Sequence, residues 1–168
     1  MNYEKDNMSV YVGTYHKYAS GSIEGRWMRL SDYDSFEEFE EACRELHKDE
    51  DGPEFMCQDY EGLPKSKYRE SGIDWLEEFF DLMDKDDDEL DKIFEYWDEV
   101  YDGADADTIL DRYFCESMSD SDFGYYLAHD LGCLEIPANL DPYFNYESYG
   151  RDCKYDFTET TSYIFSAN

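Results

Sequence analysis

The chain has 168 residues, enough for one domain or for a few very small ones. It carries 44 Asp and Glu residues against 14 Lys and Arg residues, so its formal net charge at pH 7 is −30. Such a surface excludes binding to nucleic acid or to an anionic membrane face, and it favours a strongly basic protein as the partner. The 17 Tyr, 11 Phe and 3 Trp residues can still supply several small cores, so we expect a folded protein.

Three further features of the sequence indicate the cellular compartment in which the protein works. No stretch approaches 18 consecutive apolar residues, so we expect no transmembrane helix. The first residues, "MNYEKDNMSV", lack the apolar segment of a signal peptide. The five cysteines are odd in number and contain no C-x-x-C pair, which favours reduced thiols in a cytosolic protein over disulfides or a zinc site.

Residues 1–62 predict an N-terminal α+β domain. Segments rich in β-branched and aromatic residues are expected to form its strands: 9–16, 26–30 and 54–60. Ser35, followed three residues later by Glu38, matches a capping box that opens a helix over 36–46. Apolar residues at helical spacing along this helix predict the face that it buries.

Residues 63–103 predict a central helical domain. The segment 61–72 reads as a polar linker and is the only locally basic stretch. Two helices are expected to follow it, over 74–83 and 87–102, each with an apolar stripe that includes a tryptophan. The natural arrangement for two such neighbours is an antiparallel pair.

Residues 104–168 predict a C-terminal α+β domain. Its expected helices lie near 108–115, 120–131 and 142–153, and its closing strand or strands within 155–165. Gly132 is expected to end the second of these helices, because glycine readily adopts the left-handed conformation found there. The fold class is therefore α+β, in three small parts.

The stretch from Asp84 to Glu95 has carboxylates at the spacing of a calcium-binding EF-hand loop. Position 6 of that loop requires glycine for a sharp turn, but Glu89 stands there. The apolar stripe of a helix also begins at Leu90, inside the supposed loop. We therefore predict a helix that starts near Asp87 and is capped by Asp86 or Asp87, and no metal site.

The predicted helices carry rows of carboxylates opposite their apolar stripes, at spacings of three and four residues. Each like-charged pair at such a spacing costs about 0.2–0.5 kcal/mol, so folding alone does not explain these rows. A carboxylate at every fourth residue rises by about 6 Å along a helix, so rows on successive helices could resemble the phosphate track of DNA to a basic groove. The candidate phosphate-mimicking carboxylates are Glu37, Glu41, Glu45, Asp74, Glu77, Glu78, Asp81, Asp88, Asp91, Glu95, Asp98, Glu99 and Asp102.

A merely solvated acidic face and a surface adapted to high salt are the alternatives for these rows. Catalysis has little support in the sequence. His16, His47 and His129 show no metalloprotease spacing, and no nucleophile-elbow, Walker or Rossmann pattern occurs. Carboxylate pairs are too numerous for one of them to be selected as an acid–base pair. We therefore expect neither an enzyme nor a cofactor.

Several segments, in this order, resemble the ArdA-type antirestriction proteins. They are "VYVGTYHKYASGSIEGRWMRL", "FEEFEEACREL", "QDYEGLP" and "PYFNYESYGRDCKYDF", of which the patterns at Tyr18–Trp27 and Asp59–Pro64 are the most specific. The resemblance covers nearly the whole chain. It implies a DNA mimic from mobile genetic elements that occupies the DNA-binding groove of type I restriction–modification enzymes. It also implies an elongated chain of three small domains that forms a homodimer through its C-terminal part.

The leading hypothesis is therefore a cytoplasmic bacterial inhibitor that binds the methyltransferase core of a type I restriction–modification enzyme in competition with DNA. The alternative is an acidic interaction module for another basic DNA-binding protein, such as a nucleoid protein or a repressor, that uses the same electrostatics.

Overall fold

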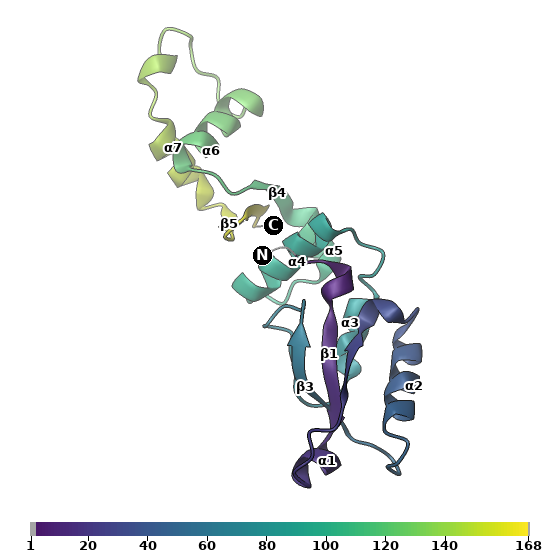
Figure 1. Ribbon diagram of the computed structural model, residues 1–168. Helices are drawn as coiled ribbons and strands as arrows, with labels where there is room; N and C mark the ends of the chain where they lie inside the picture. The colour runs from purple at the N-terminus through teal and green to yellow at the C-terminus, as the bar shows by residue number, and fades with distance from the viewer. Residues whose placement is uncertain (1–2, 168) are drawn as a thin grey trace. The chain divides into compact units, whose positions relative to one another are not determined.

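The computed structural model describes residues 3–167, which form two compact units that divide between Gly103 and Ala104 (Figure 1). The described residues are a mixture of seven α-helices and two three-stranded antiparallel sheets. The fold class is therefore α+β, as expected. The predicted division into three domains and the elongated shape stay predictions.

The sheet of the first unit has the order β2-β1-β3. Its strands are β1 (Ser9–Thr14), β2 (Arg26–Arg29) and β3 (Phe55–Glu61), with β1 in the centre (Figure 1). Val10, Val12 and Met28 are fully or almost fully buried on the face that lies under a helix. A register shift beside Tyr11 leaves one extra residue in β3, so that strand is bulged.

The helix on this sheet is α2 (Phe36–Leu46), whose Phe39 and Cys43 are buried. Ser35 caps it by accepting the Glu38 N–H, as predicted. The reciprocal bond differs from the expected capping box, because the Glu38 carboxylate accepts the Asp34 N–H at 2.8 Å instead of the Ser35 N–H. The helix nevertheless spans the predicted residues.

The first predicted strand was too long at its C-terminal end. Tyr15 and His16 belong to a short helix, α1 (Tyr15–Ala19), which Thr14 caps by accepting the Lys17 N–H. Two 3₁₀ turns complete this part of the chain, η1 (Lys5–Asn7) and η2 (Leu30–Asp32).

The central segment is helical, but its first helix is shorter than predicted. The expected helix 74–83 is divided into the 3₁₀ turn η3 (Asp74–Leu76), the short helix α3 (Glu77–Phe80) and further turns. Neither helical piece has a side chain that caps its N-terminus. Its aromatic side chains pack on rings from other elements, Phe80 on Phe39 and Phe79 on Phe94, so tertiary packing determines the backbone here.

The second central helix is α4 (Asp87–Glu99), which starts where the sequence predicts. Asp86 and Glu89 form a complete capping box. The predicted C-terminal end at residue 102 was wrong, because Val100 is already extended and Tyr101 is 83% exposed instead of lying on the apolar face. Four residues of the predicted stripe are buried, Leu90, Ile93, Phe94 and Trp97, and Val100 is half-buried.

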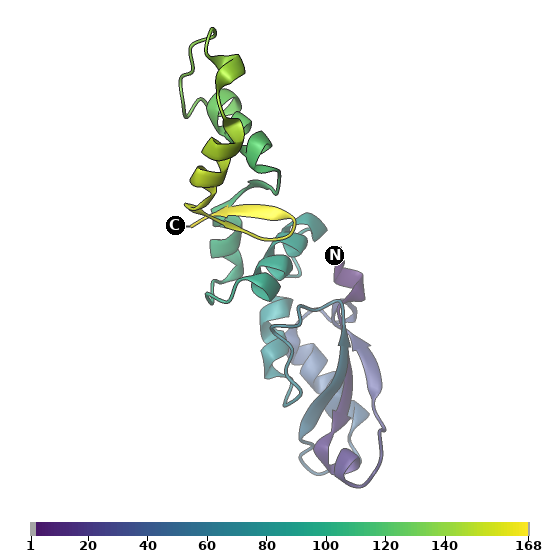
Figure 2. The same ribbon diagram turned by 90° about the vertical axis from the view of Figure 1, so that its left-hand side faces the viewer.

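The second unit begins with α5 (Ala106–Arg112) and holds a sheet of order β4-β6-β5. Its strands are β4 (Tyr113–Glu116), β5 (Phe157–Glu159) and β6 (Tyr163–Ser166); the last two form the yellow hairpin in Figure 2. The sequence predicts helix through residue 115, but residues 113–116 pair with β6 instead. Aromatic residues at 113 and 114 favour a strand once a partner strand is present.

Two helices and two helical turns lie between β4 and β5. They are α6 (Asp120–Tyr125), the π-helical turn η4 (Tyr126–Asp130), the 3₁₀ turn η5 (Asp141–Tyr143) and α7 (Tyr146–Lys154). Gly132 adopts φ +65° directly after the helical segment, as its predicted role as a C-cap requires. The last helix begins four residues later than predicted, at the Asn145 cap.

Within residues 3–167 no helix is long and apolar enough to cross a membrane. All five cysteines are free thiols. Burial raises the pKa of Cys43 and of Cys57 to about 12, so these two thiols stay protonated in the core of the first unit.

Candidate functional site

The acidic row on α2 is exposed along its full length. Glu37, Glu41 and Glu45 all face solvent, while Phe39 and Cys43 are buried on the opposite side of the helix. Glu45 forms an ion pair with the Lys48 ammonium at 2.6 Å, and both side chains are about 70% exposed. Water screens such an exposed pair strongly, so the row keeps most of its negative potential.

The second row follows η3 and α3. Asp74, Glu77 and Asp81 are exposed and line one shallow groove together with Glu78. The Lys67 ammonium lies 2.9 Å from both carboxylate oxygens of Glu78, and so offsets part of its charge. Asp74, Glu77 and Asp81 therefore display their carboxylates to solvent.

The third row, on α4, is less uniform than the sequence suggests. Asp88 is exposed and forms an ion pair with Lys92, whose ammonium is itself almost fully buried. Glu95 is half-buried, and Glu99, the last residue of the helix, is exposed.

Asp91 and Asp98 have structural contacts that the sequence did not reveal. Asp91 accepts the backbone N–H of Tyr3. Asp98 accepts the backbone N–H of Lys65 at 3.2 Å and of Ser66 at 2.8 Å, and the hydroxyl of Tyr3 at 3.3 Å. Burial, followed by the charge of Asp98, raises the pKa of Tyr3 to about 12. These two carboxylates hold the N-terminal segment and the basic segment against α4.

Asp102 was predicted to continue the α4 row, but it lies beyond the end of that helix. Its carboxylate accepts the hydroxyl of Tyr96 at 2.8 Å. The tyrosine is buried, so Asp102, although exposed itself, satisfies a polar group of the core.

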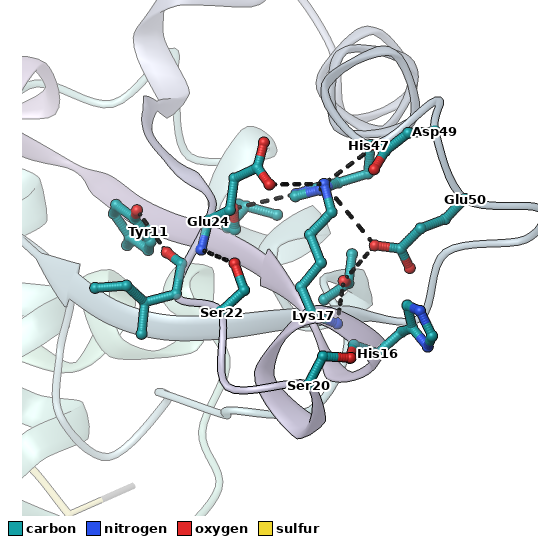
Figure 3. A network of polar contacts seen from close by, with 12 residues as sticks. Tyr11, His16, Lys17, Ser20, Ser22, Glu24, His47, Asp49 and Glu50 are labelled. Atoms are coloured by element: carbon teal, nitrogen blue, oxygen red, sulfur yellow. Dashed lines mark hydrogen bonds and ion pairs between the residues drawn. The ribbon is translucent and has the colours of Figure 1, made fainter.

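A polar network that sequence reasoning missed surrounds Lys17 on α1 (Figure 3). The Lys17 ammonium lies 3.1 Å from Asp49, 3.7 Å from Glu24 and 3.9 Å from Glu50. The Lys17 side chain is only 9% exposed, whereas those of Glu24 and Asp49 are 73% and 62% exposed. The cation thus lies behind the carboxylates that it contacts.

Neighbouring polar groups fix this ammonium further. Lys17 donates to Nδ1 of the buried His47 at 3.3 Å. Because an ammonium can only donate, Nδ1 is the acceptor and Nε2 carries the proton that faces the Val12 carbonyl, 3.3 Å away. On the other side, Thr14 donates its hydroxyl to Glu50 at 2.6 Å.

The charges in this network stabilise one another. Burial by itself would lower the pKa of Lys17, but the hydrogen bond and charge of Asp49, together with Glu24 and Glu50, outweigh it and raise that pKa. The hydrogen bond from Lys17 likewise lowers the pKa of Asp49. The acidic turn after α2 was visible in the sequence, but its pairing with a lysine some 30 positions earlier depends on the fold alone.

Among the residues that the structure describes, no three His, Cys, Asp or Glu side chains gather as metal ligands. The stretch that has the spacing of a calcium loop is instead the N-terminus of α4, with Asp86 engaged in the capping box.

A model of the ArdA antirestriction protein family matches residues 10–165. The chain belongs to the ArdA family of antirestriction proteins. The match covers nearly the whole sequence, so both compact units are part of the ArdA region. A comparison with curated proteins found no match.

Membership of the ArdA family confirms the resemblance that the sequence motifs indicate, and it implies an antirestriction function. The acidic rows on α2, α3 and α4 all lie within the matched residues. The roles of the individual carboxylates stay predictions, which the next subsection develops.

Proposed function

We propose that this chain is an antirestriction protein that acts as a DNA mimic. It occupies the DNA-binding groove in the methyltransferase core of a type I restriction–modification enzyme, in the bacterial cytoplasm. It acts by binding and not by catalysis. The antirestriction role follows from the family; the observation that supports mimicry is the display of carboxylates on three successive helices of one unit.

The exposed carboxylates are the best candidates for contacts with basic groups of the enzyme. A row with one carboxylate at every fourth residue repeats about every 6 Å along a helix axis. This is the same order as the spacing of phosphates along a DNA strand, about 3.4 Å of axis per phosphate on a winding strand. The exposed candidates are Glu37, Glu41, Glu45, Asp74, Glu77, Asp81, Asp88 and Glu99, and also Asp102, which accepts the Tyr96 hydroxyl.

We also propose that the protein works as a homodimer that is formed through residues 104–168. Exposed apolar side chains in this unit are available for such an interface. Leu140 is 53% exposed and Tyr143 is 85% exposed, and Leu131 is 46% exposed. Sedimentation analysis of the full chain tests this, and a monomer at all concentrations contradicts it.

Two experiments test the proposed function. Unmodified phage is plated on a host with a type I system, with and without the protein, and the protein should raise the plating efficiency. In vitro, the purified protein should displace DNA from the methyltransferase core, with an affinity that falls steeply as salt rises, because ions are released on binding.

If the protein binds the enzyme while DNA stays bound, the DNA groove is not its site and mimicry is the wrong mechanism. If it binds nucleoid proteins or repressors from a host lysate but no restriction subunit, the alternative of a different basic partner is favoured.

A further inference from the structure

The network around Lys17 joins three segments that are far apart in the chain. Lys17 comes from α1, Glu24 from the loop before β2, and Asp49 from the turn after α2. Glu24 and Asp49 reach the same ammonium from two sides (Figure 3). Since each has an oxygen within 4 Å of one nitrogen atom, the spacing between these carboxylates is set by Lys17.

The exposed fractions of these side chains determine which charges an approaching protein can contact. The ammonium is buried, and its contact with His47 and with the Thr14-bound Glu50 holds it there. The carboxylates of Glu24 and Asp49 remain largely in solvent. A partner therefore encounters two exposed negative groups that are joined by one lysine, whose own side chain is only 9% exposed.

We propose that Lys17 is a positioning residue for partner binding, and that Glu24 and Asp49 are two further carboxylates that contact basic side chains of the restriction–modification enzyme. This inference rests on the proposed function and extends the acidic surface beyond the helical rows. It assigns to a lysine, in a protein of charge −30, a role in presenting negative charge.

Lys48 is a matched control within the same unit. It also forms an ion pair, with Glu45, but its side chain is 72% exposed and contacts that single carboxylate. Replacing either lysine by methionine removes one positive charge and keeps a long apolar stem. If only the net charge of the protein matters, both variants should bind the basic partner equally well and slightly more tightly than the wild type.

If Lys17 positions the two carboxylates, replacing it should weaken binding to the partner instead. In the DNA-displacement assay, Lys17→Met should weaken binding by about two- to tenfold, the effect of losing one or two partly exposed ion pairs. Lys48→Met should bind as well as the wild type or better. Lys17→Arg, which keeps the charge and the donors, should recover most of the affinity.

Equal binding by folded Lys17→Met and Lys48→Met overturns the inference. Because Lys17→Met leaves three carboxylates without their cation, its folding is checked by circular dichroism at the assay temperature. If it does not fold, the double variant Glu24→Gln with Asp49→Asn decides, since both side chains are exposed.

This double variant should weaken binding and flatten its dependence on salt, and wild-type behaviour would refute the inference. Failure of the wild-type protein to displace DNA is a different outcome. It contradicts the proposed function itself, whatever the variants do.

Discussion

At the scale of single residues, carboxylates of the same charge have different roles that depend on their neighbours. Asp98 accepts two backbone N–H groups and a tyrosine hydroxyl, whereas Glu77 is exposed on α3. Asp98→Ala should therefore lower the free energy of unfolding by about 1.5–3 kcal/mol, the usual contribution of hydrogen bonds to a charged group. Urea denaturation measures this loss.

Glu77→Ala is the matched control and should change stability by less than about 0.5 kcal/mol, as exposed substitutions usually do. In the DNA-displacement assay, at a temperature where both variants are folded, Glu77→Ala should weaken binding more than Asp98→Ala does. This ranking is the reverse of their ranking by loss of stability. If both variants are as stable as the wild type, the contacts of Asp98 do not hold the segment at 65–66 in place.

Sequence periodicity predicted the exposed side of α2, but it could not identify the partners of the carboxylates. Glu37 and Glu41 face solvent because Phe39 and Cys43 must face the core, and this follows from helical spacing alone. The contacts of Asp98 with residues 65 and 66, and of Lys17 with residue 49, join positions more than 30 residues apart. No local pattern encodes such pairs.

At the scale of elements, α6 and α7 approach so closely that glycine is required at their contact. A Cβ atom on Gly124 would lie 2.1 Å from the Tyr146 carbonyl oxygen, and one on Gly150 would lie 1.9 Å from that of Asp120. Gly124→Ala and Gly150→Ala should each lower the free energy of unfolding of the second unit by about 1–3 kcal/mol or more, because the added Cβ would clash with the backbone of the facing helix. This loss should outweigh the gain of about 1 kcal/mol in helix propensity that alanine has over glycine.

Thermal unfolding followed by circular dichroism tests this contact. Ser121→Ala, at an exposed position of α6, is the control and should leave the melting temperature unchanged or raise it slightly. An unchanged melting temperature for both glycine variants contradicts the close packing of the two helices.

The elements that the sequence predicted best are those with complete local signals. Helix α4 has a capping box, a long apolar stripe and favourable acids in its first turn, and its start was predicted near the observed one at Asp87. Helix α3 has no cap, and its rings pack against α2 and α4, so its length depends on tertiary contacts. Strand β4 was predicted as helix because its partner, β6, lies some 50 residues later.

At the scale of the whole molecule, a protein of charge −30 attracts basic partners through net charge as well as through the arrangement of its carboxylates. These two effects can be separated by removing the same charge from different places. The pairs Glu37 with Glu41, and Glu77 with Asp81, belong to the exposed rows of the first unit. Glu135 and Asp156 are exposed in the second unit and outside any helical row.

Replacing each row pair by the corresponding amides should weaken displacement of DNA by about two- to fivefold, since an exposed ion pair contributes up to about 1 kcal/mol. Combining both row pairs should add their free energies, because the rows lie on separate elements. The control, Glu135→Gln with Asp156→Asn, loses the same charge and should lose less affinity. Equal losses for all three pairs would mean that net charge alone drives binding, and complete loss from one pair would indicate a discrete site instead of a distributed mimic.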